Sequence, residues 1–169
     1  MAQTDPQHND SAASSSSPST SYEVFINHRG PDVKTTFASH LYKRLTSFGL
    51  RVFLDKQELE EGRTFPSQIE AAIRSAAIHI AVFSPTYANS QWCLDELIGM
   101  ISTGATILPV FYNVEPWELR RTGKDGRYAE ALRKHEEKNR YNSETIQKWR
   151  EALCTAANIS GFELKQFNG

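Results

Sequence analysis

Short apolar runs alternate with amphipathic segments along this chain, and this alternation constrains the fold more than any other feature. Four runs have the length and composition of β-strands, and they span residues 22–27, 50–55, 77–83 and 105–112. The segments between them carry apolar residues at helical spacing. Apolar strands that alternate with helices predict a parallel sheet covered on both faces. We therefore expect an α/β fold, a flavodoxin-like open sandwich of four to five parallel strands with helices on both faces.

Local signals predict where the helices begin and end. The helix after the first strand is predicted to be capped by Asp32 and stopped by Gly49. Its regularly spaced apolar residues are Phe37, Leu41, Leu45 and Phe48. Pro66 suits the first turn of the next helix. Two amphipathic helices close the chain, over 128–137 and 146–159. Pro109 removes a hydrogen-bond donor from the fourth strand, which predicts an edge strand or a locally irregular one.

The two ends of the chain differ in composition from the rest. Residues 1–20 are Ser-rich and almost without large apolar side chains, so we expect a disordered leader, one domain over 21–163 and a flexible tail over 164–169. The leader lacks the apolar segment of a secretory signal, and no Lys or Arg precedes Arg29, unlike in a transit peptide. No apolar run approaches the ~20 residues that cross a bilayer. We expect a cytoplasmic protein, with the nucleus as a second compartment, and no membrane partner.

The charge balance and the content of cysteine and histidine exclude several classes of protein. The formal net charge is −1, which gives nucleic acid no general electrostatic attraction. Two cysteines, Cys93 and Cys154, are too few for a disulfide framework and favour a reducing compartment. The five histidines are scattered and no Cys-x-x-Cys is present, so we expect no metal site.

The helix predicted from Ser90 onward has an apolar face, but its tryptophan lies outside that face, on the same side as a glutamate. At about 100° per residue, one arc of this helix collects apolar side chains, namely Cys93, Leu94, Leu97, Ile98 and Ile101. The other side collects Trp92, Glu96 and Gly99. A glutamate there is usually just solvated, and a tryptophan usually packs. Gly99, however, has no side chain and is expected to leave space beside them, so Trp92 and Glu96 are candidate functional residues.

Polar residues also gather where the predicted strands end, which is the edge where ligands of open α/β sheets bind. They are Asn27 to Gly30 after the first strand, Asp55 after the second and Ser84 after the third. Arg29-Gly30 lies between a strand and a helix, where free N–H groups and an arginine suit a phosphate group. The alternative is an arginine paired with a neighbouring acid, and the pattern does not decide between the two.

Five segments of the chain together match a known family. They are YEVFINHRGPD, FASHLYKRL, RVFLDKQELEEG, IHIAVFSPTYANSQWCLDEL and ILPVFYNVEPWELRR. In this order and spacing they resemble a plant Toll/interleukin-1 receptor (TIR) domain, from about residue 22 to residue 162. The block SxxYxxSxWCLDEL is specific to the plant branch. The chain resembles the TIR-only type of protein found in grasses.

The resemblance implies an enzyme of plant innate immunity that cleaves NAD⁺, with ADP-ribosyl cyclase character. NAD⁺ is then consumed as a substrate, no cofactor is needed, and NADP⁺ is a second candidate substrate. The catalytic residue implied by the W-x-x-x-E pattern is Glu96. The substrate-binding residues that the resemblance implies are Trp92, Ser90, Arg29, Gly30 and Asp55. In the family the loop over 55–64 shapes the site.

A single carboxylate is chemically sufficient for this reaction. Cleavage of the nicotinamide–ribose bond expels a neutral ring, so the leaving group needs no proton and no general acid is required. The ribose passes through an oxocarbenium-like state, as in glycoside hydrolysis, but half of the usual carboxylate pair is redundant. One carboxylate can orient the ribose hydroxyls and stabilise the positive charge. A flat side chain such as that of Trp92 can stack on a base or on nicotinamide.

Self-association is the second property that the resemblance implies. Ser39-His40 matches a Ser-His pair through which related domains associate, and that assembly orders the loop over 55–64. A weak monomeric enzyme activated by crowding would follow, because ordering a loop costs free energy. The alternative is a non-enzymatic TIR adaptor, although adaptors commonly lack the glutamate of W-x-x-x-E. A third alternative, chemistry on nucleic acid, is not favoured by the near-neutral charge.

The sequence departs from the family pattern in four places. Asn27-His28 stands where Ser-Phe is common, and Pro31 replaces a glutamate in the same loop. The segment 59–62 lacks the basic residue that often precedes its glycine. Trp117 stands where a serine is usual. The geometry of the first loop and the identity of the reaction product are the properties that these departures affect most.

Overall fold

A computed structural model describes residues 21–54 and 66–165. Its strands all run parallel in one sheet of order β2-β1-β3-β4-β5. The strands are β1 (Val24–His28), β2 (Val52–Leu54), β3 (Ile78–Phe83), β4 (Thr106–Tyr112) and β5 (Phe162–Leu164). The helical segments are α1 (Gly30–Val33), η1 (Lys34–Ala38), α2 (Ser39–Ser47), α3 (Ser67–Ser75), η2 (Tyr87–Asn89), α4 (Gln91–Thr103), α5 (Pro116–Arg120), α6 (Arg127–Glu137) and α7 (Ser143–Ala157). The predicted α/β class and the parallel sheet are confirmed.

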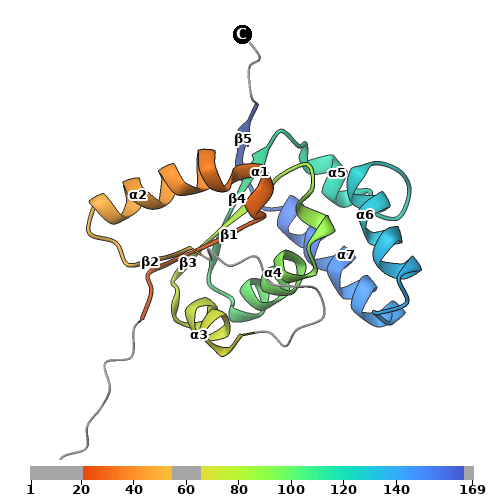
Figure 1. Ribbon diagram of the computed structural model, residues 1–169, viewed down its shortest axis with the longest axis horizontal. Helices are drawn as coiled ribbons and strands as arrows, with labels where there is room; N and C mark the ends of the chain where they lie inside the picture. Colours follow the sequence, from red (N-terminus) through yellow and green to blue (C-terminus); the bar gives the residue numbers. More distant parts are fainter. Residues whose placement is uncertain (1–20, 55–65, 166–169) are drawn as a thin grey trace, which may run out of the picture.

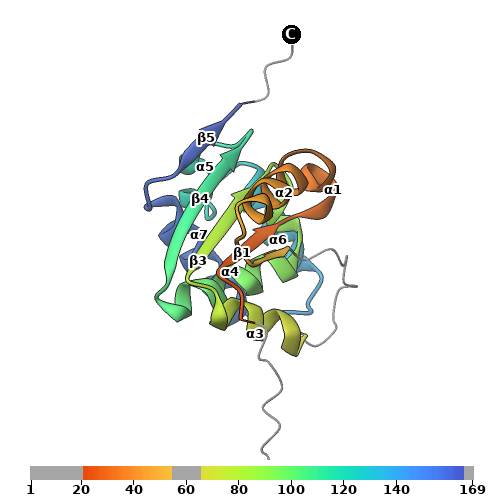
Figure 2. The same cartoon turned by 90° about the vertical axis from the view of Figure 1, so that its left-hand side faces the viewer.

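Helices cover both faces of the sheet, and each face has its own apolar cluster. Figure 1 shows α2 on one side of the sheet and α3, α4 and α7 on the other, and Figure 2, turned by 90°, shows β1, β3, β4 and β5 lying next to one another. Aromatic side chains face α3, α4 and α7, among them Phe25, Phe83 and Phe111. Aliphatic side chains face η1 and α2, among them Val24, Ile26, Ile80, Val82 and Val110. Strands buried on both faces explain the nearly continuous apolar runs of the sequence.

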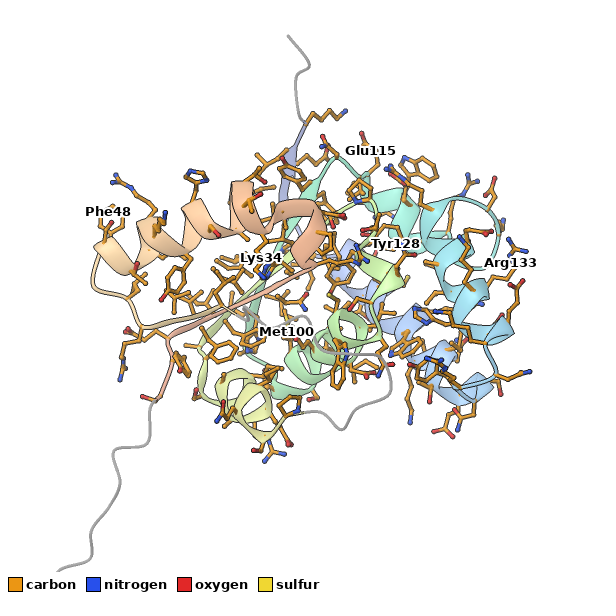
Figure 3. The ribbon with its side chains drawn as sticks, in the orientation of Figure 1. Lys34, Phe48, Met100, Glu115, Tyr128 and Arg133 are labelled. Atoms are coloured by element: carbon orange, nitrogen blue, oxygen red, sulfur yellow. The ribbon has the colours of Figure 1, made fainter. Side chains whose placement is uncertain are left out.

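The first helical region starts earlier and is less regular than predicted. Asp32 lies inside α1 and does not cap it, because Pro31 occupies the first turn and the Asp32 carboxylate bonds to another loop. A π-helical turn, η1, separates α1 from α2. Gly49 ends the region with a φ of +84°, as predicted. Phe48 was expected on the apolar face, but it is 68% exposed at the end of α2 (Figure 3), where the Arg44 guanidinium lies 4.8 Å from its ring centroid.

The fourth strand is not an edge strand over its whole length, contrary to one of the two predictions from Pro109. A fifth strand, β5, which the sequence pattern did not identify, pairs with β4. That pairing begins at Val110, opposite Phe162, whereas Pro109 is aligned only with Ala81 of β3. Pro109 therefore lies where β4 still has an open edge, and its missing N–H costs the sheet no bond to β5.

We predict that Gly161→Ala destabilises the domain by about 1–3 kcal/mol, the range for overpacking. A Cβ at this position would lie 2.5 Å from the Pro109 carbonyl oxygen and 3.0 Å from the Phe111 ring, so β5 would have to move away from β4. The free energy of unfolding from urea titration measures the effect. Gly123→Ala is the control, because its Cβ would meet only the flexible Arg150 side chain, at 3.4 Å. Equal stability of the two variants would contradict the prediction.

A hydrogen bond between side chains joins the helices α4 and α7. The indole N–H of Trp149 donates to Asp95 Oδ1 at 2.8 Å, and the Trp149 ring is fully buried. This contact explains why an acid stands at the margin of the apolar arc of α4. Within residues 21–54 and 66–165, none of the helices combines the length and apolar character needed to span a membrane.

Candidate functional site

The helix α4 carries the central candidate residues and begins where the sequence predicted. Ser90 is its N-cap, and the Ser90 hydroxyl accepts a hydrogen bond from the Cys93 N–H at 3.4 Å. Ser90 therefore has a structural role in addition to the substrate contact that the family resemblance implies. Trp92 and Glu96 are four residues apart, about one turn of α4, and therefore lie on one side of the helix.

Both of these side chains are buried, which the sequence pattern did not predict. Glu96 is 4% exposed and Trp92 is 7% exposed, so this side of α4 is not an open surface. Gly99 faces the Ile73 side chain of α3, which a Cβ at this position would meet in ordinary van der Waals contact at 3.5 Å. The carboxylate of Glu96 thus lies in the protein interior, where each polar contact has a large effect.

The Glu96 carboxylate is bound by β1, the strand at the centre of the site. Asn27 Nδ2 donates to Glu96 Oε2 at 2.8 Å and lies 3.4 Å from the Cys93 carbonyl oxygen. Asn27 is fully buried, and its carboxamide oxygen accepts a bond from the Tyr87 hydroxyl of η2. Burial raises the pKa of Tyr87 well above its usual value, so this hydroxyl remains a donor. Asn27 therefore links the Glu96 carboxylate of α4 to β1 and, through the Tyr87 hydroxyl, to η2.

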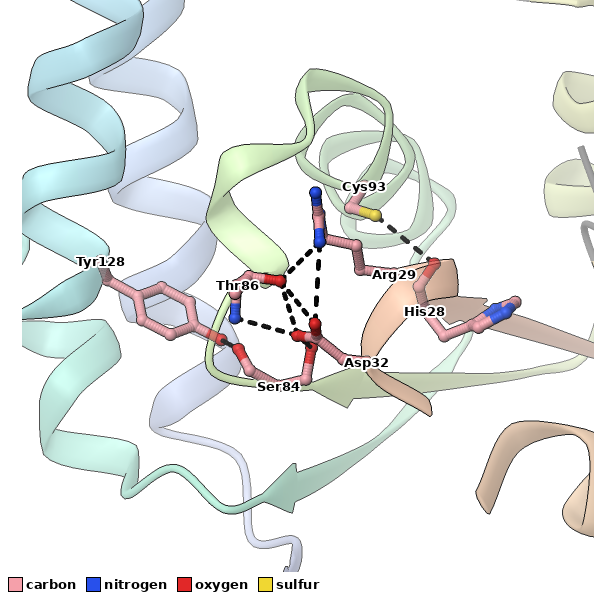
Figure 4. A network of polar contacts seen from close by, with 7 residues as sticks. All are labelled: His28, Arg29, Asp32, Ser84, Thr86, Cys93 and Tyr128. Atoms are coloured by element: carbon pink, nitrogen blue, oxygen red, sulfur yellow. Dashed lines mark hydrogen bonds and ion pairs between the residues drawn. The ribbon is translucent and has the colours of Figure 1, made fainter. Parts of the chain in front are cut away.

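A second polar network joins the loop after β1 to the loop after β3 (Figure 4). Asp32 accepts bonds from the Ser84 hydroxyl at 2.5 Å and from the Thr86 N–H at 3.0 Å, and Tyr128 donates to the Ser84 carbonyl at 2.9 Å. Arg29 Nη1 donates to the Thr86 hydroxyl at 2.6 Å and lies 3.7 Å from Asp32 Oδ1. Burial opposes the charged Asp32 carboxylate, but the bonds from Ser84 and Thr86 and the Arg29 charge outweigh it and lower its pKa.

Arg29 is thus paired with an acid, which is the alternative that the sequence left open. The guanidinium also borders a cavity of about 400 Å³ between η2 and α6. The remaining lining residues are Asn89, Ala131, Lys134, His135, Glu137 and Lys138. Three basic side chains around one cavity suit an anionic group, although an arginine held by Asp32 and Thr86 has less freedom to reach one. Gly30, the other half of the predicted Arg-Gly pair, opens α1.

His28 is buried at the end of β1. Within the described residues neither ring nitrogen makes a hydrogen bond. Its backbone carbonyl accepts the Cys93 thiol at 3.5 Å, which ties β1 to α4. Burial, with a smaller effect of the Lys34 charge, lowers the pKa of His28 to about 4. The ring is therefore neutral at physiological pH and fills the space of an apolar residue.

Ser39 and His40, the predicted self-association pair, lie away from this site. They open α2, where each bonds to a backbone carbonyl of the preceding π-helical turn, and His40 is exposed. Asp55 and the loop over 55–64 lie outside the described residues. Among the residues described, no group of three or more His, Cys, Asp or Glu side chains is arranged to hold a metal ion.

Asn27 and Tyr87 are the residues whose place at the site was not predicted. Asn27 was noted only as a polar residue at the sheet edge and as a departure from the family pattern. Tyr87 belongs to the SxxYxxSxW block, but the contact of its hydroxyl could not be deduced from spacing. The available signal was that Asn27 is a polar residue at the end of a fully apolar strand, since such a residue needs a buried partner.

The parallel sheet, its helices and the W-x-x-x-E helix define a known family of domains. A family model described as TIR domain matches residues 21–169, and the chain belongs to this family. The TMV resistance protein N of Nicotiana glutinosa is 42% identical over 154 residues, which cover 89% of this chain and 13% of that protein. The chain therefore spans only a small part of such long relatives.

Two further similarities concern a short relative and a solved structure. The "Probable 2' cyclic ADP-D-ribose synthase BdTIR" of Brachypodium distachyon is 45% identical over 98 residues, 58% of this chain and 44% of that protein. The TIR domains of the activated Roq1 resistosome, which directly recognizes the pathogen effector XopQ, match with a TM-score of 0.74 and 37% identity over 85% of this chain and 88% of that chain. The predicted resemblance to plant TIR domains is confirmed.

Proposed function

We propose that this domain cleaves the nicotinamide–ribose bond of NAD⁺ in plant innate immunity, with ADP-ribosyl cyclase character. The single observation that carries the proposal is the buried Glu96 carboxylate, held at the end of β1 by Asn27 at 2.8 Å. The similarity to a protein named as a probable cyclic ADP-D-ribose synthase, and to proteins named for disease resistance, supports the same activity and setting. NADP⁺ is a second candidate substrate.

Glu96 is assigned the stabilisation of positive charge on the ribose. The departing nicotinamide is neutral, so the reaction asks the protein for a fixed negative charge and not for a proton donor. A carboxylate in a low-dielectric site interacts with a developing cation more strongly than one in water. The amide bond from Asn27 keeps that carboxylate oriented before the substrate arrives, which lowers the cost of reorganisation.

The other residues implied by the family resemblance are assigned substrate contacts. Trp92 is proposed to stack on an aromatic ring of the dinucleotide, for which a movement that exposes its ring is required, since it is 7% exposed. Arg29 and Gly30 are proposed to bind the pyrophosphate, an assignment supported by the basic cavity that Arg29 borders. Ser90 and Asp55 complete the proposed binding set.

Self-association is proposed to activate the domain, as in an assembly of the kind named for the Roq1 TIR domains. Ser39 and His40 lie at the start of α2, and His40 is exposed to a partner. Beside α2, Phe37 and Leu41 form an apolar groove of about 300 Å³ with β3, β4 and β5. An exposed apolar groove next to polar contact residues is typical of protein–protein interfaces.

The proposal predicts that nicotinamide release from NAD⁺ rises more steeply than in proportion to protein concentration. The free energy of association offsets the cost of ordering the active conformation, which a monomer cannot offset alone. The activity per molecule therefore increases with protein concentration. Chromatography of the reaction mixture measures nicotinamide and distinguishes linear from cyclic ADP-ribose. His40→Ala is expected to reduce both association and specific activity. Association without NAD⁺ turnover at the highest protein concentration would instead identify a non-enzymatic adaptor.

A further inference from the structure

Asn27 lies behind the proposed catalytic carboxylate, at a position where the family pattern commonly has serine. Its side chain is fully buried and spans from β1 to Glu96 of α4, with Nδ2 2.8 Å from Oε2. A serine hydroxyl at the same place is shorter by one heavy atom along the chain. The length of the asparagine side chain is what lets Nδ2 reach Glu96 directly here.

The chemistry of the neighbours fixes which way the carboxamide points. Asn27 Nδ2 faces two acceptors, the Glu96 carboxylate and the Cys93 carbonyl, neither of which can donate a proton. Its Oδ1 faces the Tyr87 hydroxyl, which is a donor. The Tyr87 hydroxyl also lies 2.9 Å from the Cys93 carbonyl, so η2 and α4 both restrain it. A flipped amide would place its oxygen against the oxygens of the ionised Glu96 carboxylate and the Cys93 carbonyl, neither of which can donate.

The contact acts on both the orientation and the charge of Glu96. An N–H donor to a carboxylate favours the ionised form and removes rotational freedom from the side chain. Burial of the carboxylate would by itself favour the protonated form, which cannot stabilise a ribosyl cation. A neutral amide is the group that offsets burial without introducing a competing charge.

Several titratable side chains close to Glu96 make described contacts of their own. The Tyr87 hydroxyl of η2 bonds to Asn27 and to the Cys93 carbonyl, and the Cys93 thiol of α4 bonds to the His28 carbonyl. Asp95 bonds to α7. On α3, Glu70 and Arg74 pair with each other on the exposed side.

We propose that Asn27 is a positioning residue that keeps the Glu96 carboxylate ionised and aligned, and that Tyr87 holds Asn27 in place. This inference rests on the proposed function.

The test compares wild type with Asn27→Asp and Tyr87→Phe in the full chain, measuring nicotinamide release from NAD⁺ against pH. Asn27→Asp is nearly isosteric but places a second carboxyl beside Glu96, and two such carboxyls share one proton near neutrality. We expect kcat at pH 7 to fall by about tenfold or more with KM unchanged. The acidic limb of the pH profile moves up by about one to two pH units. Tyr87→Phe lowers kcat less, because Asn27 can still reach Glu96.

Tyr128→Phe is the matched control. It also removes one hydroxyl bond of a fully buried tyrosine, to the Ser84 carbonyl at 2.9 Å, but that tyrosine bonds to neither Asn27 nor Glu96. It is expected to lose stability as Tyr87→Phe does and to keep the wild-type pH profile. A folded Asn27→Asp protein with the wild-type kcat and pH profile would overturn the inference. If Asn27→Asp does not fold, a Tyr87→Phe kcat equal to that of Tyr128→Phe would also overturn it.

Failure of the proposed function can be told apart from failure of this inference. If wild type releases no nicotinamide, the carboxyl-carbon NMR resonance of Glu96, identified by its loss in Glu96→Gln, is titrated instead. A titration midpoint that moves to higher pH in Asn27→Asp, but not in Tyr128→Phe, supports the positioning role without any activity. A midpoint unchanged in Asn27→Asp contradicts the role whether or not the domain is an enzyme.

Discussion

Glu96→Gln is expected to lower nicotinamide release from NAD⁺ by about 10²-fold or more, the range for removing one preorganised charge or donor at a transition state. The amide keeps the size of the side chain and an oxygen that accepts from Asn27 Nδ2, so the fold should be retained. What is lost is the negative charge opposite the ribosyl cation. Single-turnover rates at saturating NAD⁺ and high protein concentration measure the effect, with chromatography of the products.

Asp95→Asn is the matched control for this loss. Asp95 is the preceding residue of α4, and its Oδ1 accepts from the Trp149 indole at 2.8 Å, a bond that an asparagine oxygen can still accept. The control removes one carboxylate from the same helix and is expected to leave turnover unchanged. If Glu96→Gln released nicotinamide as fast as Asp95→Asn, Glu96 would not be the catalytic carboxylate and the proposed mechanism would be wrong.

The fold was largely predictable because periodicity reports burial directly. The apolar runs became β1 to β4, since strands covered on both faces can hardly contain anything but apolar residues. β5 was missed because Phe162–Leu164 is only three residues long and lies at the edge of the sheet, where it pairs with β4. Phe162 is 61% exposed there, so the strand has no continuous apolar pattern. The role of Asp32 was misassigned because a capping residue and a residue that bonds a distant loop have the same local sequence.

The site was predictable as a set of positions but not as a set of contacts. Edge residues after parallel strands gather by topology, which is why Asn27 and Ser84 lie near α4 and α1. Which of them touch depends on side-chain length and on the angle of α4, and the spacing of residues in the sequence reports neither. Gly99 illustrates the limit: its spacing in the sequence does not show which neighbour it faces, and in the structure it faces the Ile73 side chain of α3.

His28 gives the domain a stability that depends on pH. Its pKa is about 4 in the folded domain against 6.5 for an exposed histidine, because the ring is buried. The unfolded chain therefore binds a proton first as the pH falls, and stability is lost from about pH 6.5 downward until the pH reaches the folded pKa. These two values correspond to a loss of about 2.5 kcal/mol between pH 7 and pH 4.5.

His28→Phe is expected to remove most of that loss, because phenylalanine, common at this position in the family pattern, cannot take up a proton. The free energy of unfolding in urea at pH 7, 6, 5 and 4.5, at fixed ionic strength and protein concentration, measures this loss of stability.

Other groups contribute to the same measurement. Burial also lowers the pKa of His79, which leaves a smaller pH dependence of the same sign in the variant. Asp32 acts in the same direction, but only below its ordinary value of 3.8, outside this range. Phe48→Ala, a change at an exposed position that carries no titratable group, serves as control and should keep the wild-type slope. If His28→Phe showed the same dependence of the unfolding free energy on pH as wild type, the folded domain would take up a proton on His28 as readily as the unfolded chain. Burial of His28 would then not explain the loss of stability in acid.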